Sequence, residues 1–134
     1  MKMIKLKVTR LENCNHYHVT KGTVIDLDLE EYVKGVVASE IGNDHIEACK
    51  AQAIAARTYV QKKKIVTDDS SIDQAFRVDR MIGAAYPNAY KAVEETAGMV
   101  LFYDGNIIDT CSYSASNGGR TTSAKMRWGS ERAW

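Results

Sequence analysis

Hydrophobic residues recur at helical spacing between positions 29 and 40. The apolar positions follow the i, i+3, i+4, i+7, i+8 series of one helix face, namely Leu29, Tyr32, Val33, Val36 and Val37. Glu40 takes the i+11 position on the same face, where the pattern calls for another apolar residue. The pattern therefore predicts an amphipathic helix whose inward face ends on a carboxylate.

The ends of this helix carry recognisable signals. Asp28 can accept the backbone N–H of Glu31 while the Glu31 side chain reaches back, which is the reciprocal arrangement of a capping box. Gly42 can adopt the left-handed conformation in which helices commonly stop. The first helix is therefore expected to span the residues between these two signals.

A second helix is expected directly after the first. Asp44 as cap and Glu47 at the third position form a second capping box. The alanine-rich run from Ile46 to about Lys63 follows, and alanine has the highest helix propensity. Two helices are thus joined by a tight corner, and Glu40 lies at that corner.

The position of Glu40 has two interpretations. On the helical pattern it faces inward or into a cleft, and burial of an unpaired carboxyl group raises its pKa toward the range that a general acid needs near neutral pH. Alternatively Glu40 is partly exposed at the helix end, or is paired with Lys50 or Arg57. The pattern alone does not choose between these interpretations.

Alternating residues predict strands at both ends of the chain. The segment 4–9 alternates apolar and polar residues, and the run "GTVIDLDL" follows a Lys21-Gly22 turn, so a hairpin should precede the helices. Near the other end, a short helix is expected from Pro87 to Gly98, followed by a hairpin turned at Asp104-Gly105. The predicted fold class is α+β, with a helical pair packed against antiparallel strands in a single domain over residues 1–134.

Composition narrows the functional classes. The chain has 134 residues and a net charge of +1, so no overall field favours nucleic acid or a membrane surface. No stretch reaches the roughly 20 apolar residues that a membrane span needs, and the first residues lack the apolar run of a signal peptide. The end "WGSERAW" leads us to expect either a short form of the domain or one whose continuation is missing.

Three cysteines, Cys14, Cys49 and Cys111, form no disulfide framework and suit a reducing compartment. Cys49 is expected to be a small core residue because its helix is apolar. Cys14, His16 and His18 could offer zinc ligands, but on an extended segment neighbours two residues apart are separated by about 7 Å. A surface strand with polar residues is the preferred interpretation of that segment.

A polar segment late in the chain offers a second set of candidate ligands. The sequence "SASNGGR", residues 114–120, supplies hydroxyl groups, an amide, an arginine and two glycines that allow close backbone approach. Such side chains can bind sugar hydroxyls, acetamido groups or carboxylates. Taken alone the segment is not distinguished from any other Gly-Gly turn.

Four collinear motifs give these candidates a context. They are "LEEYVKGVVASEI", "EACKAQAIAARTYV", "AVEETAGMVLFYDGNII" and "YSASNGGRTT" with its later "WG". Together, from about Val24 to Trp134, they resemble the SpoIID/LytB family. The resemblance implies one of two activities, either lytic transglycosylation of peptidoglycan or stimulation of cell-wall amidases.

The resemblance also assigns roles to residues. It places the catalytic glutamate on Glu40 and gives substrate-binding roles to Lys50, Arg57 and Gln74. Arg57 is expected to act mainly on the glycan or in structural pairing. Its late substrate-binding motif falls on Tyr113, Ser114, Ser116, Asn117, Gly118 and Gly119. Ser114 stands where many members carry histidine, and Glu40-Ile41-Gly42 stands where many have Glu-Met-Pro; with that histidine absent we expect no metal and no cofactor.

The implied reaction cleaves the bond between N-acetylmuramic acid and N-acetylglucosamine with one glutamate as acid and base, leaving a 1,6-anhydro end. Expected partners are peptidoglycan glycan strands and other cell-wall enzymes, with no nucleic acid and no membrane span. The alternative is a non-catalytic wall-binding or amidase-stimulating module, which could belong to a phage-derived assembly since no signal peptide is seen. The expected place of action is the bacterial cell wall.

Overall fold

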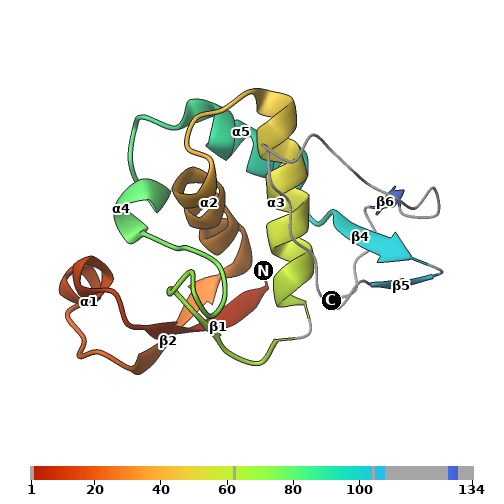
Figure 1. The fold of residues 1–134 in the computed structure, drawn as a ribbon. Coiled ribbons are helices and arrows are strands. Elements are labelled where there is room, and N and C mark those ends of the chain that lie inside the picture. The colour runs from red at the N-terminus through yellow and green to blue at the C-terminus, as the bar shows by residue number, and fades with distance from the viewer. Residues whose placement is uncertain (1, 62, 104, 108–126, 130–134) are drawn as a thin grey trace.

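The computed structural model describes residues 2–61, 63–103, 105–107 and 127–129 (Figure 1). The helices and strands follow one another in the order β1 (Met3–Val8), α1 (Leu11–Tyr17), β2 (Thr23–Asp28), α2 (Leu29–Glu40), α3 (Ile46–Val60), β3 (Val66–Thr67), α4 (Val78–Met81), α5 (Pro87–Glu95), β4 (Val100–Tyr103), β5 (Asn106–Ile107) and β6 (Arg127–Gly129). The predicted α+β class is confirmed.

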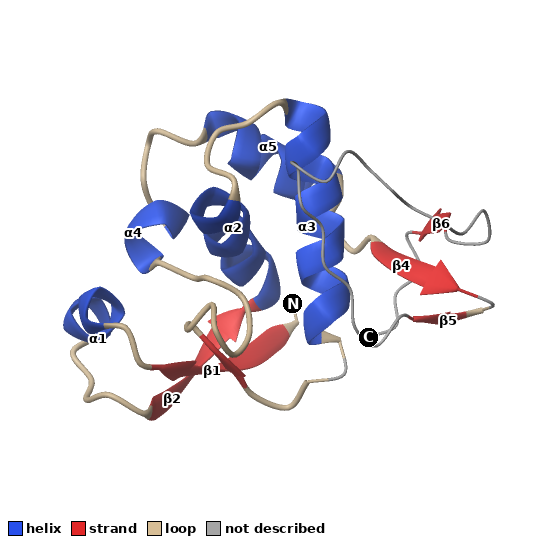
Figure 2. Ribbon diagram, in the orientation of Figure 1, coloured by secondary structure: helices blue, strands red, loops and turns tan. Residues whose placement is uncertain are grey.

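The strands form two small sheets on different sides of the helices (Figure 2). In the first sheet β1 lies between β2 and β3, antiparallel to β2 and parallel to β3. In the second, β4 lies between β5 and β6 and is antiparallel to both. Both predicted hairpins are therefore present, while the parallel β1–β3 pair was not predicted.

The helix pair forms largely as its caps predict. The Asp28 carboxylate accepts the backbone N–H of Glu31 at 3.1 Å, which confirms the first cap. Gly42 has φ +66°, a left-handed conformation that residues with a side chain adopt at a cost. The second capping box is wrong: the N-cap of α3 is His45 and not Asp44, and the Asp44 carboxylate accepts the adjacent His45 N–H at 2.7 Å. The second helix ends at Val60 and not near Lys63.

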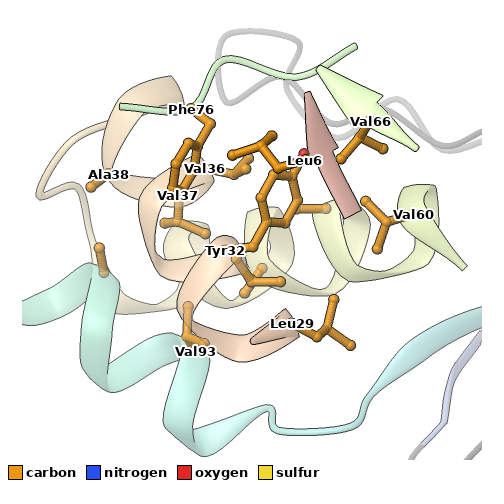
Figure 3. Packing of buried hydrophobic residues seen from close by; sticks show 14 of the residues in the cluster. Leu6, Leu29, Tyr32, Val36, Val37, Ala38, Val60, Val66, Phe76 and Val93 are labelled. Carbon is orange, nitrogen blue, oxygen red and sulfur yellow. The ribbon is translucent and has the colours of Figure 1, made fainter. Parts of the chain in front are cut away.

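The hydrophobic core lies between α2, α3 and the first sheet (Figure 3). The predicted inward face of α2 is buried, with Tyr32, Val33, Val36 and Val37 all fully inaccessible. Leu6 of β1 and Val66 of β3 complete the core from the sheet. Burial of apolar area of this kind is the dominant favourable term in folding.

The segment between β1 and β2 contradicts the sequence prediction. Residues 11–17 form helix α1 where an extended strand was expected. Cys14 faces inward and its thiol contacts the Val8 carbonyl, while His18 ends the helix with φ 58°. Packing of one face of this short helix against the rest of the chain favours the helical conformation. The local sequence of seven residues does not reveal that packing. Cys49 is buried in α3, as predicted.

The described ranges contain neither a cluster of metal ligands nor a membrane-spanning helix. No group of three or more His, Cys, Asp or Glu side chains in them is placed to hold a metal ion. No helix in them is long and apolar enough to cross a membrane.

Candidate functional site

Glu40 is the last residue of α2, and its side chain is exposed. Its Oε2 accepts a hydrogen bond from the backbone N–H of Ala75 at 3.0 Å. The prediction that Glu40 faces the interior is wrong, because the core ends at Val37 and Ala38, before the final residues of the helix. The exposed helix-end alternative is correct, but without the suggested pairing to Lys50 or Arg57.

Segment 73–77 lies against the end of α2 and holds Glu40 in place. Besides the Ala75 contact, the backbone N–H of Arg77 donates to Ser39 Oγ at 3.1 Å. Phe76 between them is fully buried and stacks on Tyr32, with ring centroids 5.3 Å apart. The segment is thus fixed to α2 by an aromatic side chain and by a backbone hydrogen bond on each side of it.

Gly35 allows the Phe76 ring to pack directly against the backbone of α2. A Cβ at this position would lie 2.3 Å from Cε1 of the Phe76 ring, far inside van der Waals contact. A glycine in the middle of a helix is unfavourable by itself. Here it allows the 73–77 segment to approach the α2 backbone closely.

The start of the segment is fixed by Asp73. One carboxylate oxygen of Asp73 accepts the Tyr59 hydroxyl at 2.6 Å, and the other accepts the Thr67 N–H at 2.8 Å. Lys63 lies 3.3 Å from the same carboxylate. Burial by itself raises the pKa of Asp73, but the hydrogen bonds from Tyr59, Thr67 and Lys63 outweigh it and lower the pKa below its usual value.

A second anchor joins the segment to the first sheet. Asn13 of α1 donates to the Phe76 carbonyl at 2.8 Å and to the buried Asp68 carboxylate at 2.9 Å, and accepts the Val78 N–H at 2.8 Å. Asp68 also accepts the backbone N–H groups of Thr9 and Arg10 and the Thr9 hydroxyl. These donors compensate for the burial of the Asp68 charge.

Gln74 lies next to Ala75 and so is brought close to Glu40. Its amide nitrogen donates to the Tyr32 hydroxyl at 3.1 Å. Burial raises the pKa of Tyr32 well above its usual value, so the hydroxyl stays protonated. Of the four residues that the resemblance assigned in the described ranges, Glu40 and Gln74 are the pair that the fold brings together.

Arg57 is fully buried and makes a structural ion pair. Its Nε and Nη2 donate to the two carboxylate oxygens of Glu30 at 3.0 and 2.7 Å, and its Nη1 donates to the Met99 carbonyl at 2.9 Å. This geometry agrees with the structural pairing that was one expectation for Arg57. Its contacts join α2, α3 and the segment that leads into β4.

Lys50 lies on the side of α3 that faces α5. It is 3.1 Å from the Glu95 carboxylate and 3.4 Å from that of Glu47. The hydrogen bond to Glu95, with that to Glu47, raises the pKa of Lys50. Within the described residues, the Lys50 ammonium group therefore contacts α3 and α5 and not the Glu40 corner.

The late binding motif falls outside the described residues. This covers the predicted positions Tyr113, Ser114, Ser116, Asn117, Gly118 and Gly119. Sequence reasoning also missed the residues that support Glu40, because one is a backbone N–H, at Ala75, and others, such as Asn13, act from far along the chain. The mid-helix Gly35 was the available signal of a close approach.

Comparisons with known proteins show what this chain is similar to. A family model described as "Stage II sporulation protein" (SpoIID) matches residues 17–103. An amidase enhancer of Bacillus subtilis is 40% identical over 101 residues, which cover 73% of this chain and 14% of the relative. Stage II sporulation protein D of the same species is 34% identical over 132 residues, 84% of this chain and 38% of the relative. The chain therefore spans well under half of either relative.

Proposed function

The chain belongs to the SpoIID family, and we propose that it acts on the bacterial cell wall as a peptidoglycan lytic transglycosylase with Glu40 as its acid and base. The observation that carries the proposal is the setting of Glu40. Its carboxylate is exposed at a helix end, and one of its oxygens is held by the Ala75 N–H. A side chain fixed through one oxygen and accessible to a polymer has the arrangement that proton transfer to a bound glycan needs.

In the proposed reaction a single carboxyl group serves both halves. Protonated Glu40 donates its proton to the glycosidic oxygen between N-acetylmuramic acid and N-acetylglucosamine as the bond from the muramic C1 to that oxygen breaks. The 6-hydroxyl of the same muramic residue then attacks C1 and gives its proton to Glu40. The product is a 1,6-anhydro ring, and Glu40 is returned to its starting protonation state.

This route needs no second acidic residue, because the nucleophile is part of the substrate. An intramolecular hydroxyl gains the advantage of proximity over a water molecule. The bound glycan would also cover the exposed Glu40 carboxylate and limit the access of water. Asp73 directly precedes Gln74 and Ala75, but its contacts to Tyr59 and Thr67 fix it as an anchor of segment 73–77.

Substrate binding is proposed to involve Gln74 beside Glu40, together with Lys50 and the late motif. Gln74 is half-buried and is held by Tyr32, so its amide oxygen can serve a ligand on the accessible side. Arg57 supports the site indirectly by fixing α2 to α3 through Glu30. The partner is therefore a peptidoglycan glycan strand.

Mass spectrometry of digested glycan tests the proposal. Purified strands, with and without stem peptides, are incubated with the protein, with Glu40→Gln and with Glu47→Gln as a control for loss of an exposed acidic residue. Ends carrying 1,6-anhydro-muramic acid should form with the protein and the control and be absent with Glu40→Gln. Reducing ends would mean hydrolysis, and the absence of any product would refute the proposed reaction.

A second candidate function is stimulation of a cell-wall amidase without glycan cleavage. It is favoured by the 40% identity to a relative named amidase enhancer. Amidase activity on purified walls, measured with and without the protein, separates the two functions. Stimulation that persists with Glu40→Gln, with no anhydro product from either protein, would support the enhancer function.

A further inference from the structure

A groove lies between the first residues of β1 and the chain that follows α3, and we call it the β1 groove. Its volume is about 510 Å³, and its described lining residues are 2–5, 60, 61 and 63–65. The groove is at the end of α3 that leads toward β3, whereas the Glu40 corner precedes the start of α3 (Figure 1). Because α3 has 15 residues, the two places are about 20 Å apart along the helix. A ligand in the β1 groove is therefore held by residues other than those of the Glu40 site.

The β1 strand has an open edge at this groove. On one side β2 pairs with the whole of β1, and on the other side β3 pairs with Leu6 and Lys7. The Lys2 carbonyl accepts the Leu29 N–H at 2.8 Å on the β2 side. Successive residues of a strand direct their backbone groups to opposite edges, so those of Met3 point away from β2 and toward the groove. Within the described ranges, Met3 therefore has no strand partner on the groove side.

Two exposed apolar side chains line the groove. Met3 is 47% exposed and Ile65 is 44% exposed. They come from different sides of the groove, one from β1 and the other from the chain just before β3. Single exposed apolar residues are common on protein surfaces, whereas apolar surface gathered in one place and surrounded by polar residues marks binding sites. The groove therefore offers contacts for apolar side chains of a ligand beside an open strand edge.

The groove is also positively charged. Its described lining contains no Asp or Glu but four lysines, namely Lys2, Lys5, Lys63 and Lys64. Lys63 lies 3.3 Å from the Asp73 carboxylate. Lys5 lies 2.8 Å from Asp26, but both side chains are exposed, and such pairs contribute little. Lys64 is exposed and has no carboxylate partner among the described residues. Since the whole chain carries a net charge of only +1, this positive charge is local and favours an anionic ligand.

We propose that the β1 groove binds a short, extended, acidic segment of a partner protein as an added strand. The backbone of that segment pairs with the open edge at Met3. Its side chains alternate between apolar contacts with Met3 and Ile65 and ion pairs with Lys64. A second copy of this chain is a poorer occupant, because pairing of two β1 edges would bring lysines together. A phosphate polymer would use the charges but neither the strand edge nor the apolar contacts. The inference goes beyond the proposed lyase reaction and does not depend on it.

Binding of two labelled peptides tests the proposal. They are Glu-Val-Glu-Val-Glu-Val and its charge-reversed form Lys-Val-Lys-Val-Lys-Val, and fluorescence anisotropy should show saturable binding of the acidic peptide only. Lys64→Glu should weaken this binding by about tenfold or more, because it reverses an exposed charge at the groove. Lys21→Glu is the matched control, since Lys21 is also exposed but does not line the groove, and it should bind the peptide as the unmodified protein does. Equal Tm values for the two variants would show that neither change disturbs the fold.

Hydrogen exchange of the Met3 amide separates strand pairing from simple attraction between charges. The acidic peptide should slow this exchange, because an added strand accepts the Met3 N–H. Inorganic polyphosphate, used as a second ligand, should bind more weakly and leave the exchange unchanged.

Three results would overturn the proposal. They are no binding of the acidic peptide, equal binding by Lys64→Glu and the unmodified protein, and an unaffected Met3 exchange. Polyphosphate that binds more tightly than the peptide would also overturn it, because the groove would then belong to an anionic polymer. Glycan cleavage enters none of these measurements, so their outcome is separate from that of the lyase test.

Discussion

Replacing Glu30 by glutamine removes the charge opposite the fully buried Arg57. Both carboxylate oxygens of Glu30 accept from the Arg57 guanidinium, at 3.0 and 2.7 Å. Glutamine offers a single acceptor oxygen, and its amino group would face a guanidinium N–H. The variant therefore leaves a buried cation with one fewer acceptor and no counter-charge.

The size of the effect follows from the exposure of the two partners. Removing one partner of a fully buried ion pair costs roughly 3–5 kcal/mol of folding free energy. Glu30 is 33% exposed, and the Met99 carbonyl still accepts one Arg57 N–H, so the loss should fall below that range, at about 2 kcal/mol. For a domain of this size this corresponds to a fall in Tm of about 6 °C.

Thermal and urea unfolding followed by circular dichroism measure this loss. Glu47→Gln provides the control, because it makes the same chemical change in an ion pair with Lys50 where the carboxylate side chain is 81% exposed. Exposed pairs contribute about 0.5 kcal/mol or less, so the control should melt close to the unmodified protein.

Two results would refute this reasoning. Equal Tm values for Glu30→Gln and Glu47→Gln would show that the buried pair does not hold α2 and α3 together. An unchanged Tm with weakened glycan binding would instead assign Arg57 to the substrate, as the family resemblance implied.

Two further predictions concern segment 73–77. Gly35→Ala should destabilise the protein by about 1–2 kcal/mol and reduce glycan cleavage, because the added Cβ would displace Phe76. Denaturant unfolding measures the stability, and the assay for 1,6-anhydro products measures cleavage. If the variant matches the unmodified protein in both assays, the close packing of Phe76 on Gly35 is contradicted. Because the pKa of Asp73 is lowered by folding, the stability that it contributes is present above its unfolded value of about 3.8 and is lost as pH falls through the folded pKa. Thermal unfolding between pH 6 and pH 2.5 should therefore show a loss below about pH 4 that is smaller in Asp73→Asn, and identical pH profiles would refute this role.

The elements that the sequence predicted correctly depend on neighbours in the chain. Asp28 caps α2 because the N–H that it accepts is three residues away, and the Tyr32 to Val37 stripe is buried because helical geometry puts those residues on one face. The β1–β2 hairpin likewise follows from alternation over a few residues. Periodicity shows which face of an element is buried, and this information is local.

The surroundings of the candidate site were decided by contacts between distant residues. The same stripe left both an inward and an exposed Glu40 open, and the fold decides for exposure, because the core ends at Val37 and Ala38 and Ala75, 35 residues away, supplies the partner of Glu40. Glu30 and Arg57 are 27 residues apart, and no local pattern pairs them. The α1 turn was missed because the packing of Asn13 against Asp68 and Phe76 selects it. Local spacing determined α2, most of α3 and the β1–β2 pairing, and the family resemblance supplied the catalytic candidate. Only the folded chain decided which side chains surround Glu40, because that choice depends on how the elements pack.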